Sequence, residues 1–180
     1  MLYLNFTIFI LLPSFISWYD ESSLKETGRK QEFRMTKVKF YDKAEDEKLK
    51  FAVIISQNQG KWVFCRHKDR DTYEVPGGHR EALENITETA GRELKEETGA
   101  MEYELTPLCV YSVCGETRDG ECLEEETFGM LYYAEIYSFE GELHHEIAEI
   151  IMTEQLPEHW SYPHIQPVLM EKAKELGFIV

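Results

Sequence analysis

Apolar and polar residues alternate along most of the chain after Met35, in short segments that are typical of strands. Residues 49–57 and 61–66 are rich in β-branched and apolar side chains, and the Asn58-Gln59-Gly60 turn between them predicts a hairpin. Further strands are expected at residues 36–41, 72–75, 102–114, 127–137 and 147–152, with Pro76-Gly77-Gly78 ending the strand at 72–75.

Two segments have helical spacing instead. Residues 85–98 are expected to form a helix that Thr87 or Thr89 caps and Gly99 ends. Residues 163–176 form the second, amphipathic helix. Because the helices are inserted among strands rather than alternating with each one, the pattern favours an α/β (α+β) fold with a mixed sheet between helices over a doubly wound parallel sheet.

The first 34 residues differ from the rest of the chain. Residues 2–18 are apolar, but they contain Pro13, lack a preceding Lys or Arg, and are short for a bilayer span of about 20 residues. Residues 20–34 are polar and have no hydrophobic period. We therefore expect 1–34 to be an N-terminal extension, either disordered or outside a native protein that starts at Met35, followed by one domain at 35–180. A membrane anchor is the less favoured alternative.

The net charge of −15 argues against a nucleic-acid polymer or an anionic membrane as partner, since both need a basic surface. An acidic protein that handles phosphates needs something to offset repulsion, and a bound divalent cation is the simplest candidate. The cysteines form no C-x-x-C pair, so we expect reduced thiols, with Cys65 and Cys109 packed in strands, and a cytoplasmic location. They are Cys65, Cys109, Cys114 and Cys122.

Three glutamates share one face of the helix expected at 85–98. Glu93, Glu96 and Glu97 are three and four residues apart, which places them within one arc of the helix surface. Like charges there repel each other, and a hard divalent cation with oxygen ligands converts that repulsion into coordination. A solvated acidic face is the alternative, and the residues around the helix decide between the two.

Those surrounding residues favour a metal site. Gly77 and Gly78 precede the helix, at a place where bare backbone can approach a ligand and where carbonyls supply hard oxygen atoms. Arg92 can hold a nearby carboxylate, and Glu84 is its expected partner.

The segment from Gly78 to Ala100 resembles the Nudix box, G-x5-E-x7-R-E-U-x-E-E-x-G-U, in which U is aliphatic. Every fixed position matches, and Ala100 is a small residue for the last aliphatic place. The resemblance implies a Nudix α/β/α sandwich. It also implies a hydrolase that uses Mg²⁺, with Mn²⁺ as a substitute, to cut a phosphoanhydride bond in a nucleoside diphosphate linked to another group.

The resemblance also assigns roles to residues. The glutamates of the helix match metal ligands, the Gly78 carbonyl matches a backbone ligand, and Arg92 with Glu84 matches a supporting pair. The general base is not fixed, and Glu96, Glu97, Glu146 and Glu149 stay open for it. The expected catalytic residues are Glu96, Glu97, Arg92 and Glu84, and the expected metal ligands are Glu93, Glu96, Glu97, Gly78 and Glu146. His79 and Arg80, next to the metal loop, are candidates for the substrate phosphates.

Three functions are weighed for this site. The leading one is a nucleoside triphosphate pyrophosphohydrolase that acts on an oxidised nucleotide such as 8-oxo-dGTP. An ADP-ribose or ADP-sugar pyrophosphatase comes second. A nucleotide-binding Nudix module without hydrolysis is the rival from another class, and it is disfavoured because every acidic position of the box is present. In each case the partner is a small nucleotide, and a homodimer is left open.

Overall fold

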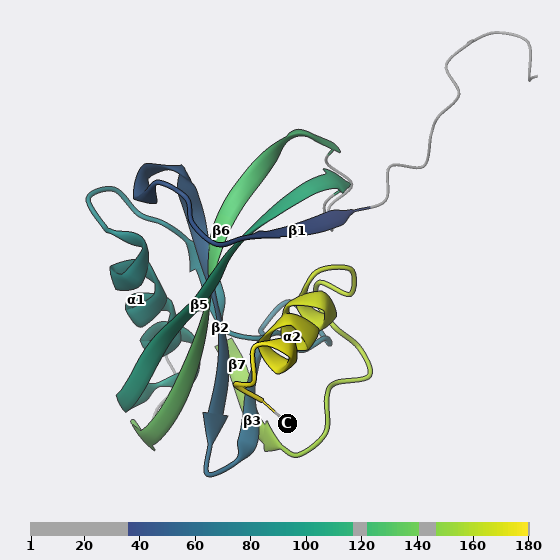
Figure 1. Cartoon of the computed structure of the whole chain (residues 1–180). Coiled ribbons are helices and arrows are strands. Elements are labelled where there is room, and N and C mark those ends of the chain that lie inside the picture. Colours follow the sequence, from purple (N-terminus) through teal and green to yellow (C-terminus); the bar gives the residue numbers. More distant parts are fainter. Residues whose placement is uncertain (1–35, 117–121, 141–146, 180) are drawn as a thin grey trace, which may run out of the picture. The chain divides into compact units, whose positions relative to one another are not determined.

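A computed structural model describes residues 36–116, 122–140 and 147–179 of the chain (Figure 1). The described residues belong to one compact unit. Residues 1–34, for which an extension was expected, lie outside the described residues. No helix in this described part has both the length and the apolar character that a membrane crossing requires. The elements are β1 (Lys37–Tyr41), η2 (Asp46–Lys48), β2 (Leu49–Asn58), β3 (Lys61–His67), β4 (Gly77–His79), α1 (Ile86–Thr98), β5 (Ala100–Glu116), β6 (Cys122–Phe139), β7 (Ile147–Thr153) and α2 (Gln166–Glu175).

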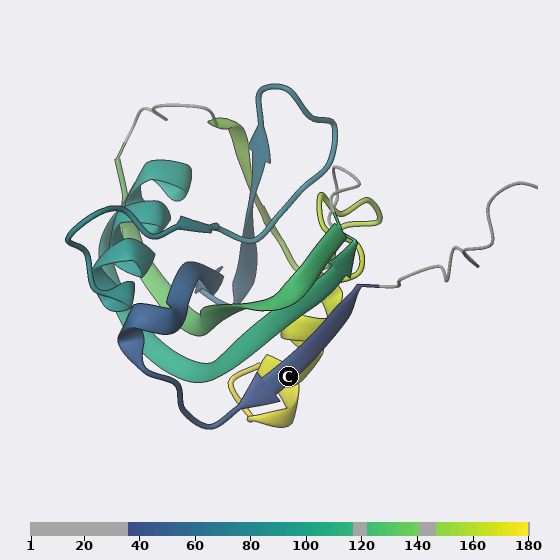
Figure 2. The same cartoon turned by 90° about the horizontal axis from the view of Figure 1, so that it is seen from above.

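The described strands form one mixed sheet, in the order β1-β5-β6-β2-β3-β7, with β4 paired to β2. The pair β2–β6 is parallel, and the pairs β1–β5, β5–β6, β2–β3, β2–β4 and β3–β7 are antiparallel. Helix α1 lies on one face of the sheet and α2 on the other (Figures 1 and 2). The expected mixed sheet between helices is therefore confirmed.

Each face of the sheet carries its own hydrophobic core. On the α1 side, Ala90 and Leu94 are fully buried in one core with Ile54 of β2, while on the α2 side Leu169 shares a core with Ile55. Neighbouring residues of β2 thus enter opposite cores. This explains why that strand is a continuous apolar run, because a strand covered on both faces has no solvent-facing side.

Helix α1 begins one residue later than expected and has a different cap. The Asn85 Oδ1 accepts hydrogen bonds from the backbone N–H of Thr87 and of Glu88, both at 3.0 Å, and the Glu88 carboxylate accepts from the Asn85 N–H at 2.8 Å. This capping box satisfies backbone donors in both directions. The prediction of Thr87 or Thr89 as the cap is therefore wrong, whereas Gly99 ends the helix in the left-handed conformation, as expected.

The strand expected at 72–75 is also wrong, because that segment makes only the isolated bridges Cys65↔Glu74 and Tyr73↔Trp160. A strand forms instead at β4, whose two glycines were expected to lie in a turn. Gly77 and Gly78 can pair with β2 because they lack a Cβ. A Cβ on Gly77 would lie only 2.5 Å from the Ala52 carbonyl oxygen. Strands β5 and β6 extend further into the intervening loop than expected, up to the pair Glu116↔Cys122.

Candidate active site

The carboxylates of helix α1 meet the glycines of β4. Oε2 of Glu97 accepts a hydrogen bond from the Gly77 backbone N–H at 2.8 Å. Glu93 packs directly on Gly78, so closely that a Cβ built on Gly78 would lie 2.1 Å from the Glu93 Oε1. The backbone of β4 thus lies directly against two of the three glutamates, and a side chain at position 78 would displace the Glu93 carboxyl group.

Arg92 connects the remaining parts of the site. Its Nε donates to Oε1 of Glu84 at 2.7 Å and its Nη2 donates to Oε2 of Glu84 at 3.2 Å, which confirms the expected pair. Its Nη1 donates to both Glu93 at 2.8 Å and Glu96 at 3.0 Å, and its Nη2 also donates to the His79 carbonyl at 3.0 Å. Because one nitrogen contacts Glu93 and Glu96 together, these two carboxylates converge on a single cationic point.

The ionisation of these groups follows from their surroundings. The hydrogen bond from Arg92 is the main cause that lowers the pKa of Glu84 to about 2. Desolvation is the main cause that raises the pKa of Glu93, and it raises the pKa of Glu97 to about 8 although the Gly77 N–H opposes it. Glu93 and Glu97 therefore sit where the charged form of a carboxyl group needs a nearby cation.

These residues fit a hard divalent cation. Three carboxylates on one helix face supply oxygen donors, and the bare backbone at Gly78 lets the Glu93 carboxyl group lie where a Cβ would otherwise be. Oε1 of Glu97 accepts no hydrogen bond from any residue that the structure describes, because both hydrogen bonds to this carboxylate end on Oε2. An oxygen so placed is available to a metal ion.

The candidate phosphate ligands, His79 and Arg80, lie in different environments. The His79 ring packs edge-on against Phe51, with ring centroids 6.0 Å apart. The Arg80 guanidinium anchors the loop after β4, because it donates to the Glu84 carbonyl at 2.6 Å and forms an ion pair with Asp46 at 2.7 Å. Arg80 is thus held by protein groups, whereas His79 is the freer of the two to change partners.

Two glutamates later in the chain, Glu146 and Glu149, were expected to be a metal ligand or a general base. Glu146 lies outside the described residues, so its expected metal contact stays a prediction. Glu149 on β7 accepts a hydrogen bond from the Arg66 Nε at 3.0 Å and another from the Tyr73 hydroxyl at 3.3 Å. Its carboxylate is therefore already paired across the β3–β7 ladder.

One acidic residue near the site was not predicted from the sequence. Glu74 is buried, with 6% of its surface exposed, and both of its oxygens accept hydrogen bonds from the Arg70 Nη1, at 3.0 and 2.8 Å. The Cys65 thiol, expected to be packed in a strand, is indeed buried in β3. Its Sγ lies 3.5 Å from the Glu74 carbonyl oxygen and 3.7 Å from Oε2 of Glu97, and it can donate to either. The available signal was the charge itself, since an acidic residue between apolar neighbours needs a buried partner.

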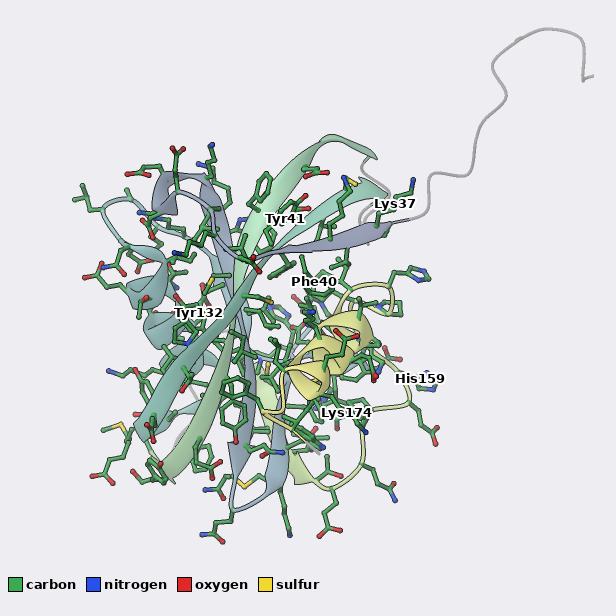
Figure 3. All side chains as sticks on the ribbon, in the orientation of Figure 1. Lys37, Phe40, Tyr41, Tyr132, His159 and Lys174 are labelled. Atoms are coloured by element: carbon green, nitrogen blue, oxygen red, sulfur yellow. The ribbon has the colours of Figure 1, made fainter. Side chains whose placement is uncertain are left out.

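Aromatic side chains lie on both faces of the sheet. Phe51 packs against Tyr111 with ring centroids 5.4 Å apart, and Phe40 of β1 lies beside α2 (Figure 3). Tyr132 points to the opposite, α1 side, where its hydroxyl lies 2.9 Å from the Thr87 hydroxyl (Figure 3). Tyr111 and Tyr132 are both buried, so they belong to the two cores rather than to an open surface.

Comparison with known proteins gives matches over the same region. The family model of the NUDIX domain matches residues 46–167. A protein of Bacillus subtilis (strain 168), YtkD, named as a candidate 8-oxo-dGTP diphosphatase, is 32% identical over 150 residues, which cover 78% of this chain and 90% of that protein.

Solved structures agree on the fold. A mutant form of the B. subtilis pyrophosphohydrolase BsRppH has a TM-score of 0.64 at 30% identity, over 81% of this chain and 93% of that one. A UDP-X diphosphatase, at 20% identity, has a TM-score of 0.56 over 76% of this chain and 66% of its own. Together with the complete box, these matches show that the chain belongs to the Nudix family, as a hydrolase that acts on phosphoanhydride bonds.

Proposed function

We propose that the chain is a Mg²⁺-dependent nucleoside triphosphate pyrophosphohydrolase, with an oxidised nucleotide such as 8-oxo-dGTP as its leading substrate and the cytoplasm as its location. The observation that carries the proposal is the convergence of Glu93 and Glu96 on one nitrogen of Arg92, with Glu97 fixed beside them by Gly77. The names of two relatives, one a pyrophosphohydrolase and one a candidate 8-oxo-dGTP diphosphatase, support this substrate class.

Glu93, Glu96, Glu97 and the Gly78 carbonyl would hold the ion, and Glu146 is a further proposed ligand. When bound, the ion supplies positive charge to the phosphate oxygens and lowers the pKa of coordinated water. Arg92 and Glu84 position the helix relative to the loop after β4, because their two hydrogen bonds join residues on both. The Gly77 N–H fixes the rotamer of Glu97, so that its free oxygen has one direction.

Glu96 and Glu97 are the proposed catalytic carboxylates. The Glu96 side chain is 37% exposed and is held by a hydrogen bond from Arg92, so it can reach a water molecule and accept its proton. Glu97 is half-buried, and desolvation favours its neutral form until a cation is present. Glu96 is therefore better placed as the general base, and Glu97 as a ligand.

The substrate would lie on the α2 side, where the His79 ring is available for a phosphate oxygen and the half-buried Phe51 ring offers aromatic surface for a base. Arg80 stays a proposed phosphate contact, which requires that it release Asp46.

A nucleotide panel with Mg²⁺ tests the proposal. The full chain would be incubated with dGTP, 8-oxo-dGTP, ADP-ribose and an ADP-sugar, and the products would be separated. We expect nucleoside monophosphate and pyrophosphate from 8-oxo-dGTP at the highest kcat/KM. Preferred cleavage of ADP-ribose or the ADP-sugar would support the ADP-sugar pyrophosphatase instead, and tight binding without turnover of any compound would support the non-catalytic module.

Variants connect that result to the helix. Glu97→Gln keeps a side-chain oxygen for the Gly77 N–H but removes a charged ligand, and we expect turnover to fall at least about 100-fold. Glu102→Gln is the matched control, because Glu102 is exposed on β5 and lies outside the box. Equal rates for wild type and Glu97→Gln would contradict the metal assignment.

A further inference from the structure

Three potential metal ligands from separate segments lie close together at helix α1. They are the thiol of Cys65 on β3, the carboxylate of Glu74 before β4, and the carboxylate of Glu97 on α1, and one ligand atom of each lies within 4.8 Å of the other two. Cys65 is fully buried and Glu74 nearly so, while Glu97 is half-buried. The group is therefore not a solvated acidic surface.

The spacing of the thiol and the carboxylate is that of two ligands on one ion. Sγ of Cys65 lies 3.7 Å from Oε2 of Glu97. In a tetrahedral site with zinc–sulfur and zinc–oxygen bonds of about 2.3 and 2.0 Å, neighbouring sulfur and oxygen ligands are about 3.5 Å apart. An ion could bind between Cys65 and Glu97 with only a small movement of either side chain.

Neighbouring protein groups orient the two carboxylates of this group. Oε2 of Glu97 accepts a hydrogen bond from the Gly77 N–H, and its Oε1 has no hydrogen-bond partner among the described residues. Glu74 is held on both oxygens by Arg70, which in turn lies over the Tyr162 ring at 5.9 Å. Metal-binding carboxylates are commonly oriented by an outer partner of this kind.

We propose that Cys65, Glu74 and Glu97 form a site for a thiophilic divalent cation such as Zn²⁺ or Cd²⁺. Its ligands differ from those of the hard-cation group, with which it shares only Glu97. A sulfur ligand selects soft cations, whereas carboxylates and carbonyls suit Mg²⁺. Binding releases the proton of the Cys65 thiol to solvent.

The site has a consequence for hydrolysis, which rests on the proposed function. A soft ion held by Oε2 of Glu97 would bring a second divalent charge next to the hard-cation group, and repulsion between the two cations would weaken Mg²⁺ binding. Zn²⁺ or Cd²⁺ is therefore expected to inhibit Mg²⁺-dependent hydrolysis. The concentration needed for half-inhibition should depend on the thiol of Cys65.

Cadmium titration of the full chain without nucleotide tests the binding site itself. A cadmium–thiolate bond gives a charge-transfer absorption band in the ultraviolet, and we expect a saturable band from wild type that Cys65→Ser loses. Cys109→Ser is the matched control, because Cys109 is also a buried strand thiol but belongs to the core on the α2 side. A band that Cys65→Ser keeps unchanged, or that Cys109→Ser abolishes, would overturn the proposal.

A second variant covers the case in which Cys65→Ser does not fold. Glu74→Gln keeps the thiol but weakens the carboxylate donor, and its cadmium affinity is expected to fall at least tenfold while the band remains. An affinity equal to that of wild type would refute the three-ligand site.

Inhibition is then measured in the Mg²⁺-dependent assay. Cys65→Ser should need at least ten times more Zn²⁺ than wild type or Cys109→Ser for half-inhibition of its own rate, and equal inhibition of all three would contradict the regulatory consequence. The two proposals fail separately: an active enzyme without the cadmium band refutes this site alone, while a band on a protein that hydrolyses no nucleotide refutes the proposed function alone.

Discussion

The backbone N–H of Gly77 donates a 2.8 Å hydrogen bond to the carboxylate of Glu97, and through it the short strand β4 orients the last turn of helix α1. The same strand pairs with β2, in the centre of the sheet. The position of Glu97 is therefore set by a strand of the sheet rather than by a loop. Such rigid support is what a site needs if its carboxylates must converge on one ion.

Gly78→Ala tests the close approach of backbone and carboxylate. The new Cβ would lie 2.1 to 2.7 Å from atoms of the Glu93 carboxyl group, so Glu93 must move away from the site. We expect kcat to fall at least about 100-fold, because ligand geometry is lost. Gly91→Ala on helix α1, which also carries Glu93, is the control. Its Cβ would meet only the Tyr103 hydroxyl, at 3.0 Å. Steady-state kinetics check this, and an active Gly78→Ala enzyme would refute it.

Arg92→Lys tests the role of the guanidinium. One ammonium group cannot reproduce the fork that contacts Glu84, Glu93 and Glu96 together. We expect reduced kcat and a loss of about 2 kcal/mol in the free energy of unfolding, measured by urea denaturation. Arg66→Lys, which keeps one ion pair to the partly exposed Glu149, should cost clearly less stability than Arg92→Lys. Equal losses of stability in the two variants would argue against a special role for Arg92.

The dependence of stability on pH tests the Glu84–Arg92 pair. The pKa of Glu84 falls from its usual 4.5 to about 2 in the folded protein. A lowered pKa stabilises the folded state above about pH 4.5, and that contribution is lost as the pH falls toward about 2. The difference in free energy of unfolding between wild type and Glu84→Gln should therefore shrink between about pH 5 and about pH 2. A difference that stays constant over this range, in denaturation experiments at each pH, would contradict it.

Much of the fold followed from the sequence because its signals are local. Period-two and helical patterns predicted most strands and both helices. The end of α1 was predicted at Gly99, because glycine readily adopts the left-handed conformation found there. The N-cap was misplaced because Thr87, Thr89 and Asn85 are all acceptable caps, and only the reciprocal bond of Glu88 distinguishes them.

The errors near β4 have a different origin. Whether Gly77 and Gly78 turn or extend depends on Ala52 and Val53 of a strand far away in the sequence, which no local pattern contains. The box positions predicted the Glu84–Arg92 pair. They did not predict that Arg92 also holds Glu93, because adjacent residues of a helix do not ordinarily face each other. The meeting of Cys65, Glu74 and Glu97 is likewise a product of tertiary packing.

The most direct test of the central claim is a crystal structure of the full chain with Mn²⁺ and a non-hydrolysable nucleotide analogue, with the anomalous signal used to locate the ion. We expect an anomalous peak at coordination distance, about 2.2 Å, from carboxylate oxygens of Glu93, Glu96 and Glu97, and next to the Gly78 carbonyl. An ion bound elsewhere on the nucleotide, with these three side chains still engaged by Arg92 and Gly77 alone, would contradict the account.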